Sequence, residues 1–172
     1  MGHKPSDEAR RDAAERLWDE HGAAIYRFAL RLSGNRSVAE DIAGETILAV
    51  LETLGRRDSP QLHLGYLFGI ALNKWRRHTR IASDPPSELV AAGSEGLEAL
   101  IDLEEAFQKL PRRLQEAFVL VKAEGFTSRE AAEILRLPQG TVQAQVHEAV
   151  HRMRSALGEE YAVAHTVQEA NT

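Results

Sequence analysis

The sequence lacks several features that would assign it at once to a protein class. It has no cysteine among its 172 residues, which excludes disulfide bonds and thiolate metal sites. No apolar run approaches the roughly 20 residues of a membrane span, and no charged-then-apolar signal segment opens the chain. A Gly-rich phosphate loop, a catalytic triad and an alternating strand pattern are also absent. We therefore expect an all-α, cytoplasmic protein with no membrane insertion, no cofactor and no catalytic metal.

The charges divide the chain into segments. The net charge is −5, which is not the basic balance typical of a nucleic-acid-binding protein. Residues 1–80 hold 13 basic and 11 acidic residues, whereas residues 81–100 hold four acidic residues and no basic one. Prolines and glycines interrupt that second segment, a composition typical of a flexible linker. We predict two small helical domains, 1–80 and 101–157, joined by a flexible acidic linker and followed by an acidic tail over 158–172.

Helical spacing predicts three helices in the first domain. The first has a stripe at Leu17, Trp18, His21, Ile25, Phe28, Ala29 and Leu32, and it stops at Gly34-Asn35. The second begins with a predicted capping box over Ser37–Glu40 and runs to about Leu54. The third follows Pro60 and has its stripe at Leu64, Leu67, Phe68, Ala71, Leu72 and Trp75. The spacing places both tryptophans, Trp18 and Trp75, in the core.

The second domain has a pattern of four helices, the last two in a helix-turn-helix arrangement. Two helices on either side of Pro111 are followed by a break at Gly125. Thr127–Glu130 predicts a capping box for the next, short helix. The final helix begins near Gln139 and buries Val142, Val146, Val150, Met153 and Leu157. A short helix, a tight turn and a longer second helix are typical of a DNA-reading module.

Motifs from both domains, in order, resemble the extracytoplasmic-function sigma factors of bacterial RNA polymerase. In the first domain they are Leu17-Trp18-Asp19-Glu20-His21-Gly22, Ala39-Glu40-Asp41-Ile42, and Gly65 through Asn73. In the second domain they are Leu110-Pro111, Gly125-Phe126-Thr127, Glu130-Ala131-Ala132 and Gly140-Thr141-Val142. The resemblance covers about residues 15 to 157. It implies a non-enzymatic subunit whose partners are core polymerase, promoter DNA and an anti-sigma factor.

The second helix of the first domain is the expected contact with core polymerase. Asp41, Glu45, Leu48 and Glu52 recur at near four-residue spacing and share one face of that helix. In the family, this face meets a basic coiled coil of the largest polymerase subunit. The resemblance also implies that the second domain contacts the flap of the second-largest subunit. One position departs from the family pattern, because Gly44 stands where a glutamine is usual.

The third helix is the expected contact with the −10 promoter element. Four cations fall within seven residues, as Lys74, Arg76, Arg77 and Arg80, and this density exceeds what stabilisation of a helix C-terminus requires. We expect these cations to contact DNA phosphates. By resemblance, Ile70 and Asn73 line a pocket for an extruded base. Asn73 is equally compatible with a structural, hydrogen-bonding role.

The final helix is the expected contact with the −35 element in the major groove. The residues that face DNA by resemblance are Gln139, Thr141, Gln143, Ala144, Gln145 and His147. Family members usually carry Lys or Arg at the start of this helix, whereas this chain has Gln143, Ala144, Gln145 and Glu148 there. Glutamine can still bond an adenine edge. An alternative is therefore a sigma-like interaction protein that binds polymerase or an anti-sigma factor but reads DNA weakly.

A third hypothesis comes from residues 147–151, which spell H-E-x-x-H. On a helix this motif places two imidazoles on one face for zinc, with the glutamate as general base. The helix belongs to a helix-turn-helix, and the only candidates for a third ligand lie in the short acidic tail. We rank a metalloprotease last. The residues favour an incidental transition-metal site at His147 and His151 over catalysis.

Overall fold

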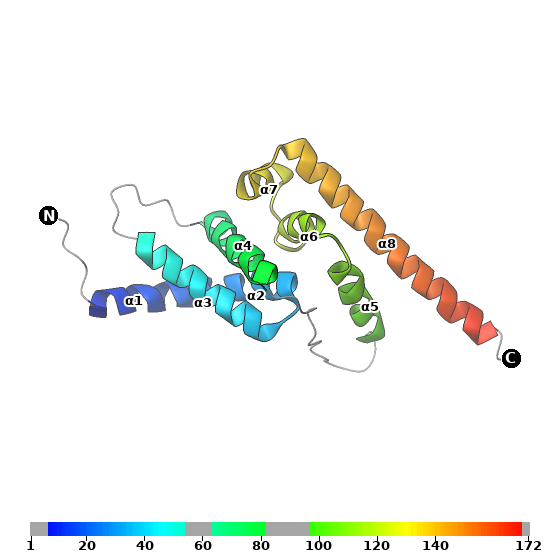
Figure 1. The fold of residues 1–172 in the computed structure, drawn as a ribbon, viewed down its shortest axis with the longest axis horizontal. Helices are drawn as coiled ribbons and strands as arrows, with labels where there is room; N and C mark the ends of the chain where they lie inside the picture. Colours follow the sequence, from blue (N-terminus) through cyan, green and yellow to red (C-terminus); the bar gives the residue numbers. More distant parts are fainter. Residues whose placement is uncertain (1–6, 54–62, 82–96, 170–172) are drawn as a thin grey trace. The chain divides into compact units, whose positions relative to one another are not determined.

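The computed structural model describes residues 7–53, 63–81 and 97–169, and no strand occurs in these ranges. The chain divides into two compact units, Met1–Glu88 and Leu89–Thr172, each built from helices (Figure 1). The predicted all-α fold with two helical parts is thus confirmed. Most of the predicted linker, residues 82–96, lies outside the described residues, so its acidic and flexible character stays a prediction.

The first unit is organised around three helices that pack on one another. These are α2 (Ala23–Ser33), α3 (Arg36–Thr53) and α4 (Leu64–Ile81), and Figure 1 shows α3 and α4 side by side. The rings of Phe28 and Phe68 stack with centroids 4.3 Å apart and planes only 4° from parallel, which joins α2 to α4. A stacked aromatic pair of this kind adds roughly 1 kcal/mol beyond the area that it buries. Trp75 is buried on α4, as predicted.

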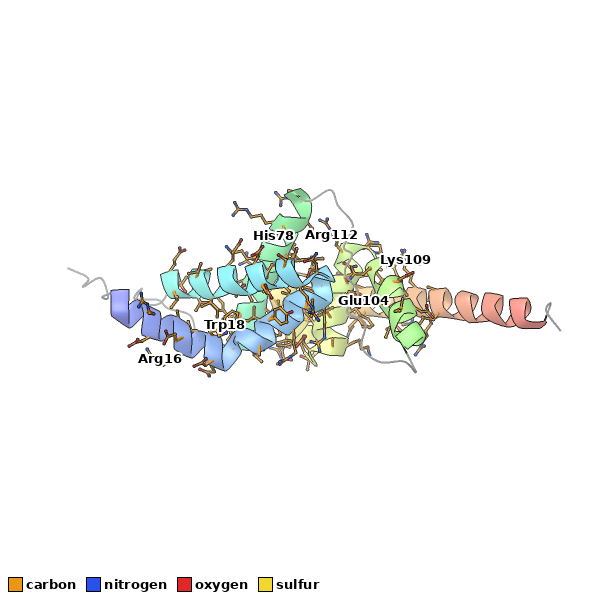
Figure 2. The ribbon with its side chains drawn as sticks, turned by 90° about the horizontal axis from the view of Figure 1, so that it is seen from below. Arg16, Trp18, His78, Glu104, Lys109 and Arg112 are labelled. Atoms are coloured by element: carbon orange, nitrogen blue, oxygen red, sulfur yellow. The ribbon has the colours of Figure 1, made fainter. Side chains whose placement is uncertain are left out.

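The first helix begins earlier than its apolar stripe predicts. Helix α1 spans Asp7–Leu17, and a short π-helical segment, η1 (Trp18–Gly22), connects it to α2. The sequence of α1 is dominated by charged residues and alanine, good helix formers without an apolar stripe, so periodicity could not find it. The wide turn at η1 changes the helical phase. As a result the prediction that Trp18 lies in the core is wrong: its side chain is 47% exposed at the junction of α1 and α2 (Figure 2).

Two glycines inside helices of this unit have opposite surroundings. A Cβ added at Gly44 would meet nothing within 4 Å, whereas a Cβ at Gly22 would lie 2.8 Å from Cδ2 of the Trp18 indole. We expect Gly44→Ala to raise the free energy of unfolding by about 0.5–1 kcal/mol, because alanine removes backbone freedom from the unfolded chain. Gly22→Ala should lower it by about 1 kcal/mol or more, because the indole must move. Urea unfolding followed by tryptophan fluorescence measures both, since Trp18 and Trp75 lie in this unit. Equal effects of the two substitutions would contradict this prediction.

The start of α3 differs from its sequence prediction. The helix is capped by Asn35, whose side-chain oxygen accepts a hydrogen bond from the Val38 N–H at 3.0 Å. The Asn35 carbonyl also accepts from the Ala39 N–H at 3.0 Å. Ser37 therefore lies within the first turn of α3, and the predicted capping box over Ser37–Glu40 is wrong. Gly34, with φ +61°, ends α2 in the left-handed conformation, and the cap of α3 lies two residues earlier than the serine pattern predicts.

The second unit places the helix-turn-helix against two further helices. Helices α5 (Leu97–Gln108) and α6 (Arg112–Phe118), the π-helical segment η2 (Val119–Ala123) and α7 (Ser128–Leu135) precede the long α8 (Gln139–Glu169). Helices α5, α6 and α7 all contact α8 (Figure 1). The buried Gln115 side chain closes the end of α5 by donating to the Phe107 carbonyl at 3.0 Å and to the Gln108 carbonyl at 3.3 Å. Thus α6 fixes where α5 stops.

The turn of the helix-turn-helix has well-defined ends. Thr127 caps α7, and its hydroxyl and backbone N–H both bond to the Glu130 carboxylate, so the predicted capping box is confirmed. These bonds from the Thr127 side chain and backbone hold the pKa of Glu130 below its ordinary value. At the other end Arg136 takes a left-handed conformation, with φ +56°, and ends α7. Pro138 then leads directly into α8.

Helix α8 is longer than the sequence pattern predicts. It continues to Glu169, whereas the apolar stripe ends near Leu157 and residues 158–172 are predicted as a tail. Val142, Val146 and Met153 are buried as predicted, whereas Val150 and Leu157 are half-exposed. The residues after the stripe contain no proline, and a single glycine at 158 costs only about 1 kcal/mol of helix stability. Loss of the apolar stripe therefore does not mark the end of the helix.

Candidate nucleic-acid interface

One face of α3 presents an apolar side chain among acidic ones. Asp41, Leu48 and Glu52 are exposed, and the Leu48 side chain is 61% exposed. The opposite face of α3 is buried through Ile42, Thr46 and Val50. Because the Leu48 side chain is mostly exposed to solvent, it contributes little to the core of its own unit. It is an available apolar anchor, and the carboxylates beside it favour a basic partner.

Glu45 differs from the other residues of this predicted face. Its carboxylate lies 3.2 Å from the Lys74 Nζ and 3.4 Å from the His78 Nε2, so it is turned toward α4. Glu45 is therefore engaged with α4, although 42% of its side chain is exposed. Its part in the docking face predicted with Asp41, Leu48 and Glu52 stays a prediction. Lys74 and His78 are four residues apart on α4, and this spacing lets both side chains reach one carboxylate. His78 is labelled in Figure 2.

The bridge between α3 and α4 changes the ionisation of Glu45. Partial burial acts to raise its pKa, but hydrogen bonding and charge attraction from Lys74, and then from His78, outweigh burial and hold the pKa below its ordinary value of 4.5. The charged form is thus favoured by the folded state. The bridge stabilises the packing of α3 on α4 by no more than about 1 kcal/mol, because Glu45 is half-exposed.

This bridge predicts an acid-sensitive contribution to stability. A carboxyl group with a lowered pKa in the folded state stabilises the fold above its unfolded pKa, and the contribution disappears as the pH falls from about 4.5 through the folded pKa. We expect the wild-type protein to lose more stability between pH 5 and pH 3 than Glu45→Gln does. Tryptophan fluorescence during urea unfolding at each pH measures the difference. Asp41→Asn, which removes an exposed carboxylate of the same helix, should behave as wild type does.

The residues predicted to hold an extruded −10 base lie on one side of α4. Ile70 is half-exposed and Asn73 is exposed. Helical spacing puts both on the side opposite the buried stripe that Phe68, Leu72 and Trp75 form. An apolar side chain and an amide are therefore accessible together on this side of the helix.

The predicted cationic cluster of α4 divides into two groups. Arg77 and Arg80 are exposed, and Arg77 lies four residues after Asn73 on the same side of the helix. Lys74 is engaged with Glu45, and Arg76 is only partly exposed. The pair Arg77 and Arg80 therefore forms the accessible part of the cluster.

The predicted −35 residues lie in the first turns of α8. Five of the six are exposed: Gln139, Thr141, Gln143, Ala144 and His147. Gln145 is partly buried beside the stripe of Val142 and Val146, and its side-chain oxygen is buried with no hydrogen-bond partner in the described part of the chain. Gln145 is thus less available to a base edge than Gln143. Near the middle of the helix, Arg152 is paired with Glu148 at 2.6 Å, which partly neutralises the next cation along α8.

The H-E-x-x-H motif does not form a catalytic zinc site among the described residues. Its glutamate, Glu148, points to Arg152 instead of toward the two histidines. No group of three metal-ligating side chains occurs within the ranges that the structure describes. The metalloprotease hypothesis therefore has neither a general base nor a third ligand there.

Sequence reasoning missed two features of these surfaces. It gave no role to His78, although its four-residue spacing from Lys74 signals a shared face on one helix. It also placed Trp18 inside the fold, because a π-helical turn has no sequence signature in a single chain. Within the described helices, none is both long and apolar enough to span a lipid bilayer.

Comparison with known proteins identifies both units. The family model described as "Sigma-70 region 2" matches residues 17–83, and that described as "Sigma-70, region 4" matches residues 100–153. A region 2 that carries a cationic helix, followed by a region 4 helix-turn-helix, defines a sigma factor, a DNA-binding transcription initiation factor. The order of the two matches is the order of the two units along the chain.

Relatives place the chain within one group of sigma factors. It is 32% identical over 166 residues to the ECF RNA polymerase sigma factor SigE of Mycolicibacterium smegmatis, a match that covers 84% of this chain and 63% of that protein. It is 30% identical over 143 residues to the ECF RNA polymerase sigma factor EcfG of Rhodopseudomonas palustris, covering 78% of this chain and 79% of that protein. The chain belongs to the extracytoplasmic-function (ECF) sigma factors, as the motifs predict.

Solved structures share the fold. The sigma factor RpoE in complex with the anti-sigma factor NepR from Bartonella quintana matches with a TM-score of 0.71 and 23% identity, over 84% of this chain and 96% of that one. CnrH in complex with the cytosolic domain of CnrY matches with a TM-score of 0.67 and 23% identity, over 87% of this chain and 90% of that one.

Proposed function

We propose that this protein directs promoter-specific transcription initiation by docking on core RNA polymerase through α3 and contacting the −10 and −35 elements through α4 and α8. Membership of the ECF sigma factors supports the general role. The exposure of individual side chains on the three helices supports the contacts. A subunit of this kind acts in the cytoplasm and has no catalytic residues of its own.

The docking contact rests on Leu48. An exposed leucine between Asp41 and Glu52 gives an apolar anchor with an acidic rim. The family partner is the basic coiled coil of the largest polymerase subunit. Charge complementarity with it speeds encounter, and burial of the leucine supplies the affinity. The second unit adds a contact with the flap of the second-largest subunit.

The −10 contact rests on one side of α4. Ile70 and Asn73 offer an apolar surface and an amide to an extruded base, and Arg77 with Arg80 offers charge to the phosphates. Trp75 is buried, so it does not stack on a base. Duplex opening by this helix is therefore driven by base capture and charge rather than by intercalation of Trp75.

The −35 contact rests on the first turns of α8. Gln139, Thr141, Gln143, Ala144 and His147 are exposed there, which is where a recognition helix reads base edges. Gln143 is the best placed to bond an adenine edge. Cations for phosphate contacts must come from neighbouring elements, where Arg112, Arg113, Lys122 and Arg129 are exposed.

An anti-sigma factor is a proposed partner. The two solved structures compared above are complexes, RpoE with the anti-sigma factor NepR and CnrH with the cytosolic domain of CnrY. A partner that covers Leu48 and its acidic neighbours would block docking on polymerase.

The observation that carries the proposal is the exposure of Leu48 on α3 in the same unit as the exposed arginines of α4. Transcription in vitro tests it directly. Core polymerase with this protein should initiate from selected promoter fragments, whereas core alone should not. Absence of both core binding and initiation at low salt would refute the proposal.

The second candidate function is an interaction protein that binds polymerase but reads DNA weakly. The lack of Lys or Arg between Arg136 and Arg152, together with the Glu148–Arg152 pair, favours it. Sequence preference of the polymerase complex at −35 distinguishes the two functions, because only the first requires it.

A substitution on α8 tests whether this face meets DNA. We expect Gln143→Arg to tighten binding of any duplex and to steepen the salt dependence by about one unit of log–log slope, because one phosphate contact is added. Electrophoretic mobility shifts at a series of salt concentrations measure both. Ser155→Arg, farther along the exposed side of α8, is the control. Unchanged affinity and slope for Gln143→Arg would show that this face does not meet DNA.

A further inference from the structure

Two histidines on α8 form a pair to which the proposed function gives no joint role. His147 and His151 are both exposed and are four residues apart on a continuous helix, so their side chains lie on the same face, one turn apart. Neither imidazole has a hydrogen bond or ion pair with any other residue that the structure describes. Both rings therefore have free nitrogen lone pairs.

The surroundings of this pair leave room for a hydrated ion. Ala144, three residues before His147, and Ser155, four residues after His151, are small, exposed neighbours along this face. Gln143 and Arg154 are longer exposed neighbours beside it. Glu148, the acidic residue between the histidines, is held by Arg152 at 2.6 Å. Both imidazoles are therefore accessible to solvent, and the carboxylate between them is engaged with Arg152.

We propose that His147 and His151 form an open, two-imidazole site for a divalent transition-metal ion such as Zn²⁺ or Cu²⁺. Imidazole suits both ions, and helical i, i+4 spacing brings two imidazoles to one metal. Two ligands from one helix bind together much more tightly than either alone, because the second binds within the same molecule. With no third ligand nearby among the described residues, the other coordination positions are filled by water.

If α8 contacts DNA as the proposed function requires, metal bound at this site affects DNA binding. The chain has no Lys or Arg from residue 137 to residue 151, so the recognition helix brings no cation of its own to DNA over its first turns. A bound ion adds two positive charges at its exposed side and keeps open positions that a phosphate oxygen can take. Metal loading should therefore strengthen duplex binding by a helix that is otherwise poor in cations.

The site is tested first without DNA. Isothermal titration of the untagged, full-length protein with ZnCl₂, and separately with CuCl₂, should show one site tighter than any other histidine provides. His147→Gln and His151→Gln should each weaken that site by about a hundredfold. His63→Gln, which removes an exposed histidine on another element, and Glu148→Gln should leave it unchanged. All these residues except the partly exposed Glu148 are exposed, and circular dichroism verifies that each variant is folded.

The titrations and a spectrum distinguish a two-imidazole site from adventitious binding. Retention of the tightest site in both histidine variants would overturn the proposal. A loss on Glu148→Gln as large as that on His151→Gln would also overturn it, because the carboxylate would then be a ligand. Nitrogen hyperfine coupling from two imidazoles in the electron paramagnetic resonance spectrum of the Cu²⁺ complex would support it, and coupling from a single imidazole would count against it.

The effect on DNA is measured separately. With Zn²⁺ at saturation, binding of a duplex should become tighter and its log–log salt slope steeper by about 1.8, for two added charges. His147→Gln with His151→Gln should remove this response to metal. If metal binds but DNA affinity does not change, the proposed effect of the metal on DNA binding is wrong. The proposal of a two-imidazole metal site is then unaffected. If the protein binds no duplex with or without metal, the proposed effect on DNA is wrong. The proposed function fails separately, when the protein neither binds core polymerase nor supports initiation.

Discussion

Leu48→Arg should weaken binding of core polymerase by roughly a hundredfold, or about 3 kcal/mol. The leucine is the exposed apolar side chain of the docking face on α3, and a new cation there would oppose a basic partner. Because the side chain is 61% exposed, the fold should hardly change, with an effect on the free energy of unfolding within about 0.5 kcal/mol. Fluorescence anisotropy of labelled protein titrated with core polymerase measures the affinity.

The matched control is Leu64→Arg. Leu64 is also an exposed leucine of the first unit, with 42% of its side chain exposed, but it lies at the start of α4. It should leave core binding within about threefold of wild type. If Leu64→Arg weakens binding as much as Leu48→Arg does, added positive charge rather than a specific docking anchor accounts for the result.

Removing both exposed arginines of α4 should have the second large effect. We expect Arg77→Ala with Arg80→Ala to lower the affinity of the polymerase complex for promoter DNA by roughly thirtyfold and to reduce the log–log salt slope by about 1.8, because two phosphate contacts are lost. Both side chains are exposed, so folding should be unaffected. Filter binding of promoter fragments over a range of salt concentrations measures affinity and slope together.

A charge-matched control uses another helix of the same unit. Arg11→Ala with Arg16→Ala removes two exposed arginines of α1 and changes the net charge equally; Arg16 is labelled in Figure 2. Its salt slope should equal that of wild type. An equal loss of slope in the two double variants would indicate that overall charge, not α4, sets the affinity.

The apolar stripes of the sequence predicted most of the helices. Where a helix buries a stripe, as α4 does through Phe68, Leu72 and Trp75, spacing found it. Where it does not, spacing failed: α1 is charged on most sides, and α8 runs on past its stripe to Glu169. A helix cap was predicted correctly where two residues form a capping box, as Thr127 and Glu130 do. The cap that Asn35 makes with its side chain alone was not predicted.

The sequence predicted which residues share a face of one helix, but not which side chains meet between two helices. Periodicity put Glu45 with Leu48 on α3 and Lys74 with Asn73 on α4, each correctly assigned to its helix. Which side chains meet across two helices depends on their packing, and the spacing within either helix contains no information on it. The same limit applies to Gln145, whose spacing fits a DNA-facing residue while its side-chain oxygen is buried beside the core of the second unit.

The bridge from Glu45 to Lys74 and His78 has a mechanical consequence. It joins the helix proposed to bind polymerase to the helix proposed to hold the opened strand, and so restrains sliding of one along the other. A phosphate that recruits Lys74 would compete with Glu45 for the same ammonium group. DNA binding at α4 would then weaken the bridge to α3, which links the charge partners of the two proposed surfaces.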